Sequence, residues 1–529
     1  MTMPRLRKMT ILMVLSMAVN MYLLCSEDVD VETLLKYQKA LESESNARES
    51  PYLLLTGLEW DEEQQSYVNS LTMPPEEIIK VLEKTSRNLP IAFIERNRNK
   101  ILRLTETCAR FPSVYDIQFN NLYWQKLPTA KGMIYLYGAY YDNRTLEPQR
   151  PVVRLLAIMN TEKGLPQTVC QFWFDEQETP VFSETSYSYI WEKRWNVHNV
   201  RGLEPYLITC SVPKSHRHLI PQAVTLVQST CDFASNSLRV IYNLPEKETQ
   251  QEDFAVCVKG FDFYFEDNTK RLIEWLELLS ALGAHKVFYY SLGMNAKMEK
   301  MMNYYVDKGF VEVIPTTLPA SQPNIPGLLF KYVFSRDKFQ HEVIQLNDCY
   351  YRNLYRYKYT VHLDVDEVIV PRFAPTWQRL MQTLEKKSAK DNLPYVSYCA
   401  RHTYYMDHML PSQEWLQDVP SHLHMLQHVI RSANYSRIQE SVKCIHSTAG
   451  GLHLHNHYPL LALGETFPYA YAIPTHDAQL NHYRRNCHDY VINCYESFKR
   501  YTVFDPVVWK FKDKIISEVN KTFSYLGYS

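Results

Sequence analysis

The sequence lacks a charge excess of either sign. Its 57 Lys and Arg residues face 58 Asp and Glu residues, which leaves a formal net charge of -1. This balance gives no basic footprint of the kind that nucleic-acid-binding proteins carry, so nucleic acid is set aside as a partner. The 529 residues contain no internal repeat and no low-complexity tract, and 46% of them are hydrophobic. These features predict a globular protein of more than one domain.

Long apolar runs are also scarce, and the chain has one, at residues 9–25. The absence of further runs excludes a polytopic receptor or transporter. Basic residues precede this run and acidic residues follow it, and the bulky end at Tyr22-Leu-Leu-Cys25 is not a signal-peptidase site. We therefore expect an uncleaved transmembrane anchor, with a cleaved secretory signal as the alternative. The positive-inside rule then places the tail of residues 1–8 in the cytosol and the rest in the lumen.

The 11 cysteines lack both the spacing of a zinc site and that of a compact disulfide scaffold. They are compatible with a few luminal disulfides, and Cys487 and Cys494 are candidates for one bridge. Glycosylation sequons begin at Asn143, Asn434 and Asn520. These sequons permit a secretory location but do not argue for it, because a long chain contains such triplets by chance.

Residues 26–109 are polar and are predicted to form a stem. Residues 110–250 contain short β-rich runs broken by turn residues, which predict an antiparallel accessory module that either binds an acceptor glycan or braces the next domain. We favour the bracing role. The runs are Gly132–Tyr141, Val152–Ile158, Val169–Phe174 and Tyr206–Val212.

From about residue 251 the pattern changes to alternating strands and helices. Strands are predicted at 254–260, 286–290 and 310–314, with helices between them that end at Gly283 and Gly309. A further helix is predicted from a cap at Ser335 through Tyr350. Such alternation is typical of a Rossmann-like α/β domain with a parallel sheet, whose ligands bind beyond the carboxyl ends of the strands.

Two carboxylates stand at such a strand end. Asp364 and Asp366 lie two positions apart in the β-branched run Tyr359–Pro371, and Glu367 follows them directly. On a strand the two aspartates would face the same way. Such a pair can chelate a hard divalent cation and leave coordination positions for the diphosphate of a nucleotide sugar. Isolated Asp-x-Asp triplets are common, and the other interpretation is a strand end with exposed acids.

An ordered set of motifs across roughly residues 130–490 resembles glycosyltransferase family 92. Each motif is weak alone, but their order is specific. The motifs are Ala139-Tyr-Tyr-Asp-Asn-Arg144, Val153-Arg-Leu-Leu-Ala157, Cys257-Val-Lys-Gly260, Arg271-Leu-Ile-Glu-Trp-Leu276, Leu282-Gly-Ala-His285, Leu346-Asn-Asp-Cys-Tyr350, Leu363-Asp-Val-Asp-Glu-Val-Ile-Val-Pro371, Lys443-Cys-Ile445 and Asn481-His-Tyr-Arg484.

The resemblance implies a catalytic domain of the metal-dependent GT-A fold, which we place at residues 251–500, with a C-terminal extension at 501–529. Members of the family are similar to galactosyltransferases that use UDP-galactose and Mn²⁺; some extend the fucose on the core of N-glycans, and others build plant galactans. It thus implies inverting transfer of galactose to a glycan hydroxyl in a type II Golgi membrane protein. The alternatives are another UDP-sugar donor and a non-catalytic luminal glycan-binding protein.

The same resemblance assigns roles to individual residues. Asp366, assisted by Asp364, would bind Mn²⁺, and a third ligand would come from a C-terminal histidine, with His455 and His482 as first choices; these histidines could instead line the acceptor cleft. The donor would lie near Lys259, Gly260, Glu367 and Arg484. Lys259 could also be a solvated lysine, and Glu367 could hold a strand or loop in place, whereas Arg484 could pair with a diphosphate oxygen.

Inverting transfer also needs a general base, usually a carboxylate, to take the proton of the acceptor hydroxyl. Among the downstream acids Asp407, Glu414, Glu440 and Asp477, we favour Asp407, although each could be a surface acid. Aromatic residues stack on sugar rings, and the candidates for this role are Trp377, Tyr404 and Tyr405.

Overall fold

The computed structural model of the chain describes residues 74–97, 108–160, 164–175, 177–192, 203–245, 250–333, 337–391, 395–412, 416, 418–438, 440, 442–464, 469–487 and 493–528. The predicted tail, the anchor at 9–25, most of the stem, Ser335 and Glu414 lie outside these residues. Within the described part, no helix is both long and apolar enough to cross a membrane.

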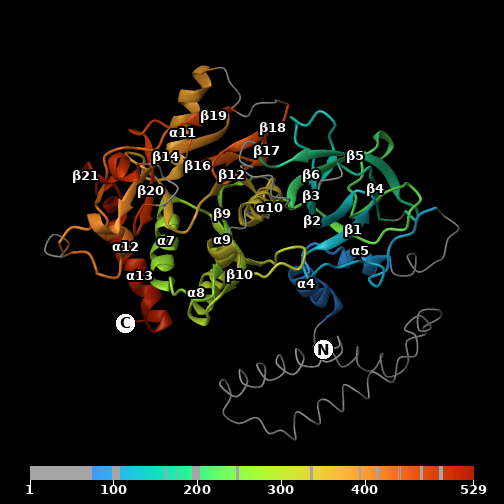
Figure 1. Cartoon of the computed structure of the whole chain (residues 1–529), viewed down its shortest axis with the longest axis horizontal. Coiled ribbons are helices and arrows are strands. Elements are labelled where there is room, and N and C mark those ends of the chain that lie inside the picture. The colour runs from blue at the N-terminus through green and yellow to red at the C-terminus, as the bar shows by residue number, and fades with distance from the viewer. Residues whose placement is uncertain are drawn as a thin grey trace, which may run out of the picture. The chain divides into compact units, whose positions relative to one another are not determined.

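The first sheet has eight strands in the order β1-β2-β3-β6-β5-β4-β7-β8. Figure 1 labels β1 to β6 of this sheet. Neighbours in this order are antiparallel, and β8 also pairs in parallel with β2. The runs predicted as strands are confirmed as β2, β3, β4 and β6. The bounds are β1 (Gln125–Thr129), β2 (Gly132–Asp142), β3 (Val152–Met159), β4 (Val169–Trp173), β5 (Val181–Tyr189), β6 (Glu204–Ser211), β7 (Ala223–Val227) and β8 (Leu238–Ile241).

Two helices precede this sheet within the predicted stem, α4 (Pro75–Thr85) and α5 (Ile91–Arg96). Phe93 of α5 is buried against Phe111 and Trp173, and Glu83 of α4 pairs with Arg239 of β8 at 2.8 Å. This part of the stem therefore packs on the first sheet.

The second sheet carries the candidate site. Its order is β11-β10-β9-β12-β16-β14-β20-β13, with β19 beside β14. Strands β9, β10, β11 and β12 are parallel, and β16 joins β12 antiparallel. The bounds are β9 (Glu252–Phe263), β10 (Lys286–Met294), β11 (Val311–Pro315), β12 (Tyr357–His362), β13 (Glu367–Pro371), β14 (Tyr395–Met406), β16 (Val442–Ser447), β19 (Tyr469–Ala472) and β20 (Ala478–Arg484).

The predicted strand–helix alternation is confirmed, and the chain is a mixed α/β protein. Gly283 and Gly309 follow the first two predicted helices with φ of 95° and 74°, a backbone region that glycine enters without strain. The helices are α7 (Thr269–Leu282), α8 (Ala296–Asp307), α9 (Pro326–Val333), α10 (Asp337–Arg352), α11 (Trp377–Ser388), α12 (His424–Gln427) and α13 (Lys512–Leu526); β15 (Ile430–Ser432) pairs with β21 (Thr502–Phe504), and β17 (Gly451–Leu454) with β18 (Pro459–Ala462).

One prediction was wrong in its local geometry. Asp364 and Asp366 do not lie on a strand, because β12 ends at His362 and β13 begins at Glu367. The carbonyl of Asp364 accepts a hydrogen bond from the N–H of Glu367 at 3.0 Å. This i to i+3 bond is that of a β-turn, so the two aspartates lie in the connection that reverses the chain.

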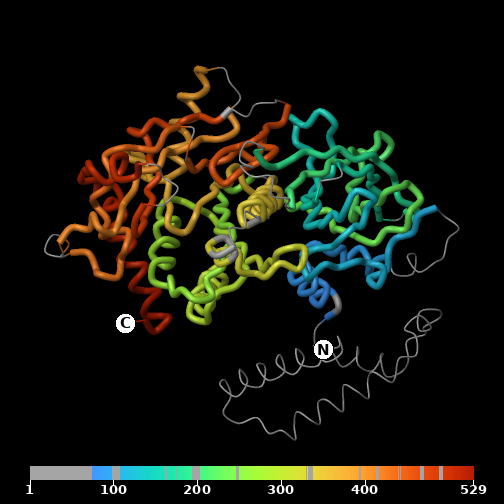
Figure 2. Tube along the Cα trace, viewed as in Figure 1, coloured from blue at the N-terminus to red at the C-terminus, as the bar shows by residue number. Residues whose placement is uncertain are grey.

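Helix α10 packs against both sheets. On one side Val343 and Tyr350 join a buried cluster with strands of the first sheet, and on the other Leu346 and Cys349 join a cluster with β9 and β10. The tube trace shows α13 beside α7, although about 240 residues separate them (Figure 2). Residues of α13 share the core of the second sheet, so the segment predicted as a C-terminal extension packs with the predicted catalytic domain.

Candidate functional site

The turn from Asp364 to Glu367, which we call the acidic turn, lies at the carboxyl end of the parallel strand β12. In the β12–β9 ladder His362 pairs with Cys257, and the N–H of Leu363 donates to the carbonyl of Cys257. Two residues further along the chain from each member of this pair, Lys259 meets Asp364, with Lys259 Nζ 3.2 Å from Asp364 Oδ1. The register of the parallel pair therefore sets the first contact of the site.

Both carboxylate oxygens of Asp364 are bound by lysines. Lys259 holds Oδ1, and Lys443 Nζ lies 3.0 Å from Oδ2. Burial alone would raise the pKa of Asp364, but the two lysines outweigh it and hold the pKa well below its ordinary value. Lys259 also pairs with Glu342 of α10 at 2.7 Å. Asp364 is thus an ionised, anchored side chain.

Lys443, the second residue of β16, is a fully buried cation. Besides Asp364 it contacts Glu367 Oε2 at 3.2 Å, and it donates a hydrogen bond to Asn456 Oδ1. Sequence reasoning missed Lys443 as a site residue, although its motif supported the resemblance. The available signal was a single lysine in the otherwise apolar run Val442–Ile445, because a buried lysine needs charged or polar partners.

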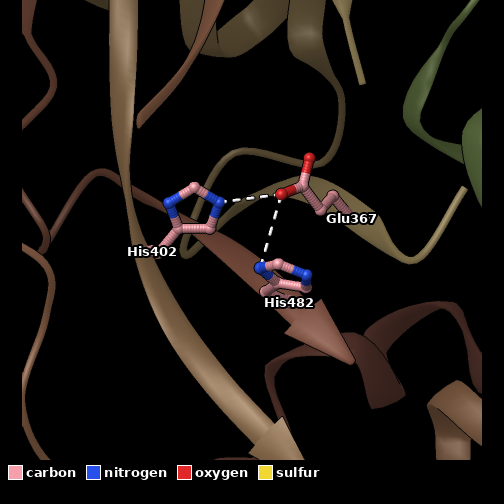
Figure 3. Close-up of side chains that lie close together, drawn as sticks. All are labelled: Glu367, His402 and His482. Carbon is pink, nitrogen blue, oxygen red and sulfur yellow. Dashed lines mark hydrogen bonds and ion pairs between the residues drawn. The ribbon is translucent and has the colours of Figure 1, made fainter. Parts of the chain in front are cut away.

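Glu367 joins the turn to two histidines (Figure 3). His402 Nε2 on β14 donates to Glu367 Oε1 at 2.8 Å, and His482 Nδ1 on β20 lies 3.4 Å from the same oxygen. Burial would raise the pKa of Glu367, but Lys443 and the two histidines lower it well below its ordinary value. Glu367, His402 and His482 form one of two groups of metal-capable side chains in the described residues. His402 was not predicted from the sequence.

His482 connects this buried group to Asp366. Its Nε2 lies 3.3 Å from Asp366 Oδ2, and the Asp366 side chain is 46% exposed, against 2% for Glu367. Burial would lower the pKa of His482, but the carboxylates of Asp366 and Glu367 outweigh it and raise the pKa. A carboxylate oxygen and an imidazole nitrogen thus meet where the site reaches solvent, and both are donor types that bind divalent metal ions.

Of the other predicted site residues, Gly260 and Arg484 lie on the strands that carry Lys259 and His482, whereas His455 contacts a separate group of rings. Gly260 has a φ of 57° and donates its N–H to Gln345 of α10 at 2.6 Å, and Arg484 ends β20 two residues after His482. His455 contacts the rings of Trp191, His457 and Tyr458 and belongs to neither metal-capable group of the described residues.

The acids considered as bases are dispersed. Asp407 Oδ1 faces His424 and His428 at 3.3 and 3.2 Å. Glu440 pairs with Arg437 on the surface, and Asp477 pairs with Lys387. The structure brings none of these three to the acidic turn.

All three aromatic candidates are buried, and one of them lies beside the site. Trp377 and Tyr405 are fully buried because both rings pack in the hydrophobic core. The prediction that they stack on a sugar was therefore wrong. Tyr404 lies 5.4 Å from the His482 ring and is the candidate that remains beside the site. The three sequon asparagines are exposed, and their glycosylation stays a prediction.

The cysteine prediction is confirmed. Cys487 and Cys494 form a disulfide, and three further bridges join Cys170 to Cys210, Cys257 to Cys349 and Cys399 to Cys444.

The model of glycosyltransferase family 92 matches residues 252–524, which is more than half of the chain. The chain belongs to glycosyltransferase family 92. A search of curated proteins found no match.

The family 92 match begins at β9 and ends within α13, and therefore contains the whole second sheet and every residue of the acidic turn. It also includes most of residues 501–529. A family 92 glycosyltransferase takes a nucleotide-sugar donor and a glycan acceptor, and the chain is accordingly an enzyme of glycosyl transfer.

Proposed function

We propose that the chain is a metal-dependent galactosyltransferase of the GT-A fold, which transfers galactose from UDP-galactose to a glycan hydroxyl with inversion. The observation that carries this proposal is the acidic turn at the carboxyl end of β12, where Asp366 faces His482. The parallel order β11-β10-β9-β12 supports a nucleotide-binding fold, because doubly wound sheets bind nucleotides at this edge.

In this proposal Asp366 and His482 hold Mn²⁺, and His482 takes precedence over His455. Once bound, the ion would neutralise charge on the diphosphate of the donor. Glu367 orients His482 and His402, and the indole of Trp275 on α7 donates to the Glu367 carbonyl at 2.8 Å. This support holds the imidazole in place before a donor arrives.

Asp364 acts as an anchored carboxylate in the proposed donor site. Two lysines fix its position and already neutralise its charge, whereas Asp366 has no lysine partner among the described residues. We therefore assign Asp364 to positioning the donor, beside Lys259 and Gly260. Arg484, at the end of β20, is the proposed partner of a diphosphate oxygen, since guanidinium binds such groups bidentately. The proposed reaction does not use Asp407 as the base, because its carboxylate faces His424 and His428.

We further propose the luminal side of the Golgi as the location, with residues 9–25 as a type II anchor and the first sheet as a brace. The four disulfides support an oxidising compartment. The packing of α10 against both sheets supports the brace, because the helix that carries Glu342 to Lys259 also contacts the first sheet.

Substitution of Asp366 tests the metal assignment. Asp366→Asn keeps the size of an exposed turn residue, and we expect it to lower kcat by on the order of 100-fold or more without shifting the thermal unfolding midpoint. Asp253→Asn, which alters a surface pair with Lys358 at the amino end of β9, is the matched control and should retain activity. Full activity of Asp366→Asn would contradict the assignment.

The two predicted histidine ligands can be separated in the same assay. His482→Asn should raise the Mn²⁺ concentration needed for half-maximal transfer by at least about tenfold. His455→Asn should leave that concentration unchanged, since His455 packs against other rings. The reverse pattern would assign the ligand to His455.

A further inference from the structure

A second group of metal-capable side chains lies where β14 ends. Asp407 directly follows β14, His424 begins α12, and His428 directly follows that short helix. Asp407 Oδ1 lies 3.3 Å from His424 Nε2 and 3.2 Å from His428 Nε2, and the three ligand atoms all lie within 4.8 Å of one another. One carboxylate oxygen therefore receives two imidazole nitrogens from a separate segment.

The backbone fixes which nitrogen of His428 carries a proton. His428 Nδ1 lies 2.6 Å from the carbonyl oxygen of His424. A carbonyl accepts and never donates, so Nδ1 holds the hydrogen, and in the neutral ring Nε2 presents a lone pair. That lone pair belongs to a His428 side chain that is 0% exposed, and it faces Asp407 Oδ1, which is also an acceptor. Two acceptors at this distance repel each other unless a cation lies between them or Nε2 is protonated as well.

The two separations between Asp407 Oδ1 and the histidine nitrogens match those of a tetrahedral metal centre. Zinc–nitrogen and zinc–oxygen bonds of about 2.0–2.2 Å at tetrahedral angles place the nitrogen and oxygen ligands about 3.3 Å apart. The observed separations are 3.3 and 3.2 Å. The His428 Nδ1 bond to a carbonyl is also the outer contact that metal-bound histidines generally make, because it orients the ring and raises its basicity.

This group is distinct from the acidic turn. Tyr404 and Tyr405 of β14 pair with His482 and Tyr483 of β20, and consecutive residues of a strand point to opposite faces. The His424 and His428 rings lie 6.1 and 5.8 Å from the Tyr483 ring, whereas His402 and Tyr404 lie beside His482. The second group therefore lies on the face of the sheet opposite to Glu367.

We propose that Asp407, His424 and His428 bind a divalent transition-metal ion of the zinc class through Oδ1, Nε2 and Nε2. Three protein ligands leave one tetrahedral position, on the side where Asp407 is 35% and His424 14% exposed. The ion fastens the end of β14 to α12, whose Met425 and Leu426 N–H groups donate to Glu274 of α7 at 2.9 Å. This site does not depend on the proposed donor or acceptor.

Zinc binding by the full-length chain, purified without a polyhistidine tag and stripped with EDTA, tests the proposal. Bound metal is counted by mass spectrometry after equilibration with Zn²⁺, and affinity is measured against a fluorescent chelator. We expect one zinc that Asp366→Asn retains, and on the order of 100-fold weaker binding in His424→Ala and Asp407→Asn. His476→Ala, in an exposed histidine 3.7 Å from Asp477, is the matched control and should bind as the parent does.

Unchanged zinc affinity in both His424→Ala and Asp407→Asn would overturn the proposal and make the group an imidazolium–carboxylate pair. Asp407→Asn keeps the residue's size at a partly exposed position, so it carries the test if His424→Ala does not fold. Cobalt gives a second readout: the parent and His476→Ala should show the visible absorption of tetrahedral Co²⁺, and Asp407→Asn should lose it.

Discussion

The acidic site is built from charges that neutralise one another. Lys443 and Glu367 are almost completely buried, whereas Asp366 is half exposed. Buried ions are tolerated when each is paired and hydrogen-bonded, and the loss of one partner leaves the other uncompensated. The residues that hold the site therefore also contribute to its stability, while Asp366 can be exchanged with less effect on folding.

Lys443→Met should lower the free energy of unfolding by about 3–5 kcal/mol, because it leaves Glu367 buried without its cation. Urea denaturation measures the change. Adding Glu367→Gln should recover part of the loss, since the double variant no longer buries an unpaired carboxylate. Strict additivity of the two single losses would show that Lys443 and Glu367 do not interact.

At the residue scale, the sequence predicts those site residues that can be recognised from the spacing of their near neighbours in the chain. Asp364 and Asp366 stand out because they follow an apolar run, and Glu367 adjoins them. His402 and Lys443 could not be placed, because their roles depend on the pairing of β14 with β16 and β20, residues far apart in the chain. Asp407 was visible as an acid, but the two histidines it meets arrive from a segment without a regular pattern.

At the scale of elements, several motifs of the family resemblance contain residues that connect the first sheet to elements of the second or to the segment that follows β16. Arg144 follows β2, pairs with Asp142 at 2.7 Å, and donates to the carbonyls of Thr448 and Gly451 next to β17. Arg144 thus ties the first sheet to the segment that follows β16. In α10, Asp348 accepts hydrogen bonds from Tyr140 and Tyr290, which belong to different sheets.

Asp142→Asn should lower the free energy of unfolding by about 3–5 kcal/mol at pH 7, because Arg144 and Arg154 lose a buried partner. Burial would raise the pKa of Asp142, but the two arginines lower it below its ordinary value of 3.8. The stability that this carboxylate contributes is therefore present above about pH 3.8 and is lost as the pH falls below it.

Urea denaturation between pH 7 and pH 2 checks this prediction. The parent chain should lose the contribution of Asp142 at the acidic end, and the difference between the parent and Asp142→Asn should shrink there. Asp175→Asn, in an exposed pair with Arg96, is the control and should change stability by less than about 1 kcal/mol. A difference that stays constant down to pH 2 would contradict the assigned pKa direction.

The elements of the second sheet up to β12 could be predicted because apolar periodicity and glycine caps are local signals. The acidic turn could not, since a β-branched run continues through Asp364–Asp366 and a strand is its simplest interpretation. What ends the strand is the turn bond between Asp364 and Glu367, followed by the antiparallel pairing of β13 with β20. That pairing joins residues more than 100 positions apart, and no local pattern encodes it.

At the scale of the whole molecule, the disulfides connect elements that build the site. Cys257 lies two residues before Lys259, and its bridge to Cys349 fastens β9 to α10, the helix that carries Glu342. Cys399 and Cys444 join β14 to β16 one residue beyond Lys443. Oxidation during folding would therefore fix both lysines relative to Asp364.

Removal of the Cys257–Cys349 bridge by paired alanine substitutions should destabilise the chain by about 4 kcal/mol, because the bridge closes a separation of 92 residues. The Cys487–Cys494 bridge closes a separation of 7 residues, and its removal should cost about 2 kcal/mol. Unfolding in urea without reductant measures both, and an equal loss in the two variants would contradict the loop-length argument.

The most direct test of the central claim is UDP release by the full-length chain, incubated with UDP-sugars and core-fucosylated N-glycans, with Mn²⁺ or with EDTA. The account predicts release with UDP-galactose, dependent on both metal and glycan, absent in Asp366→Asn and retained in Asp253→Asn. Metal-dependent release with a different UDP-sugar would overturn the donor. No release from any donor, by a folded chain that binds glycans, would contradict the account.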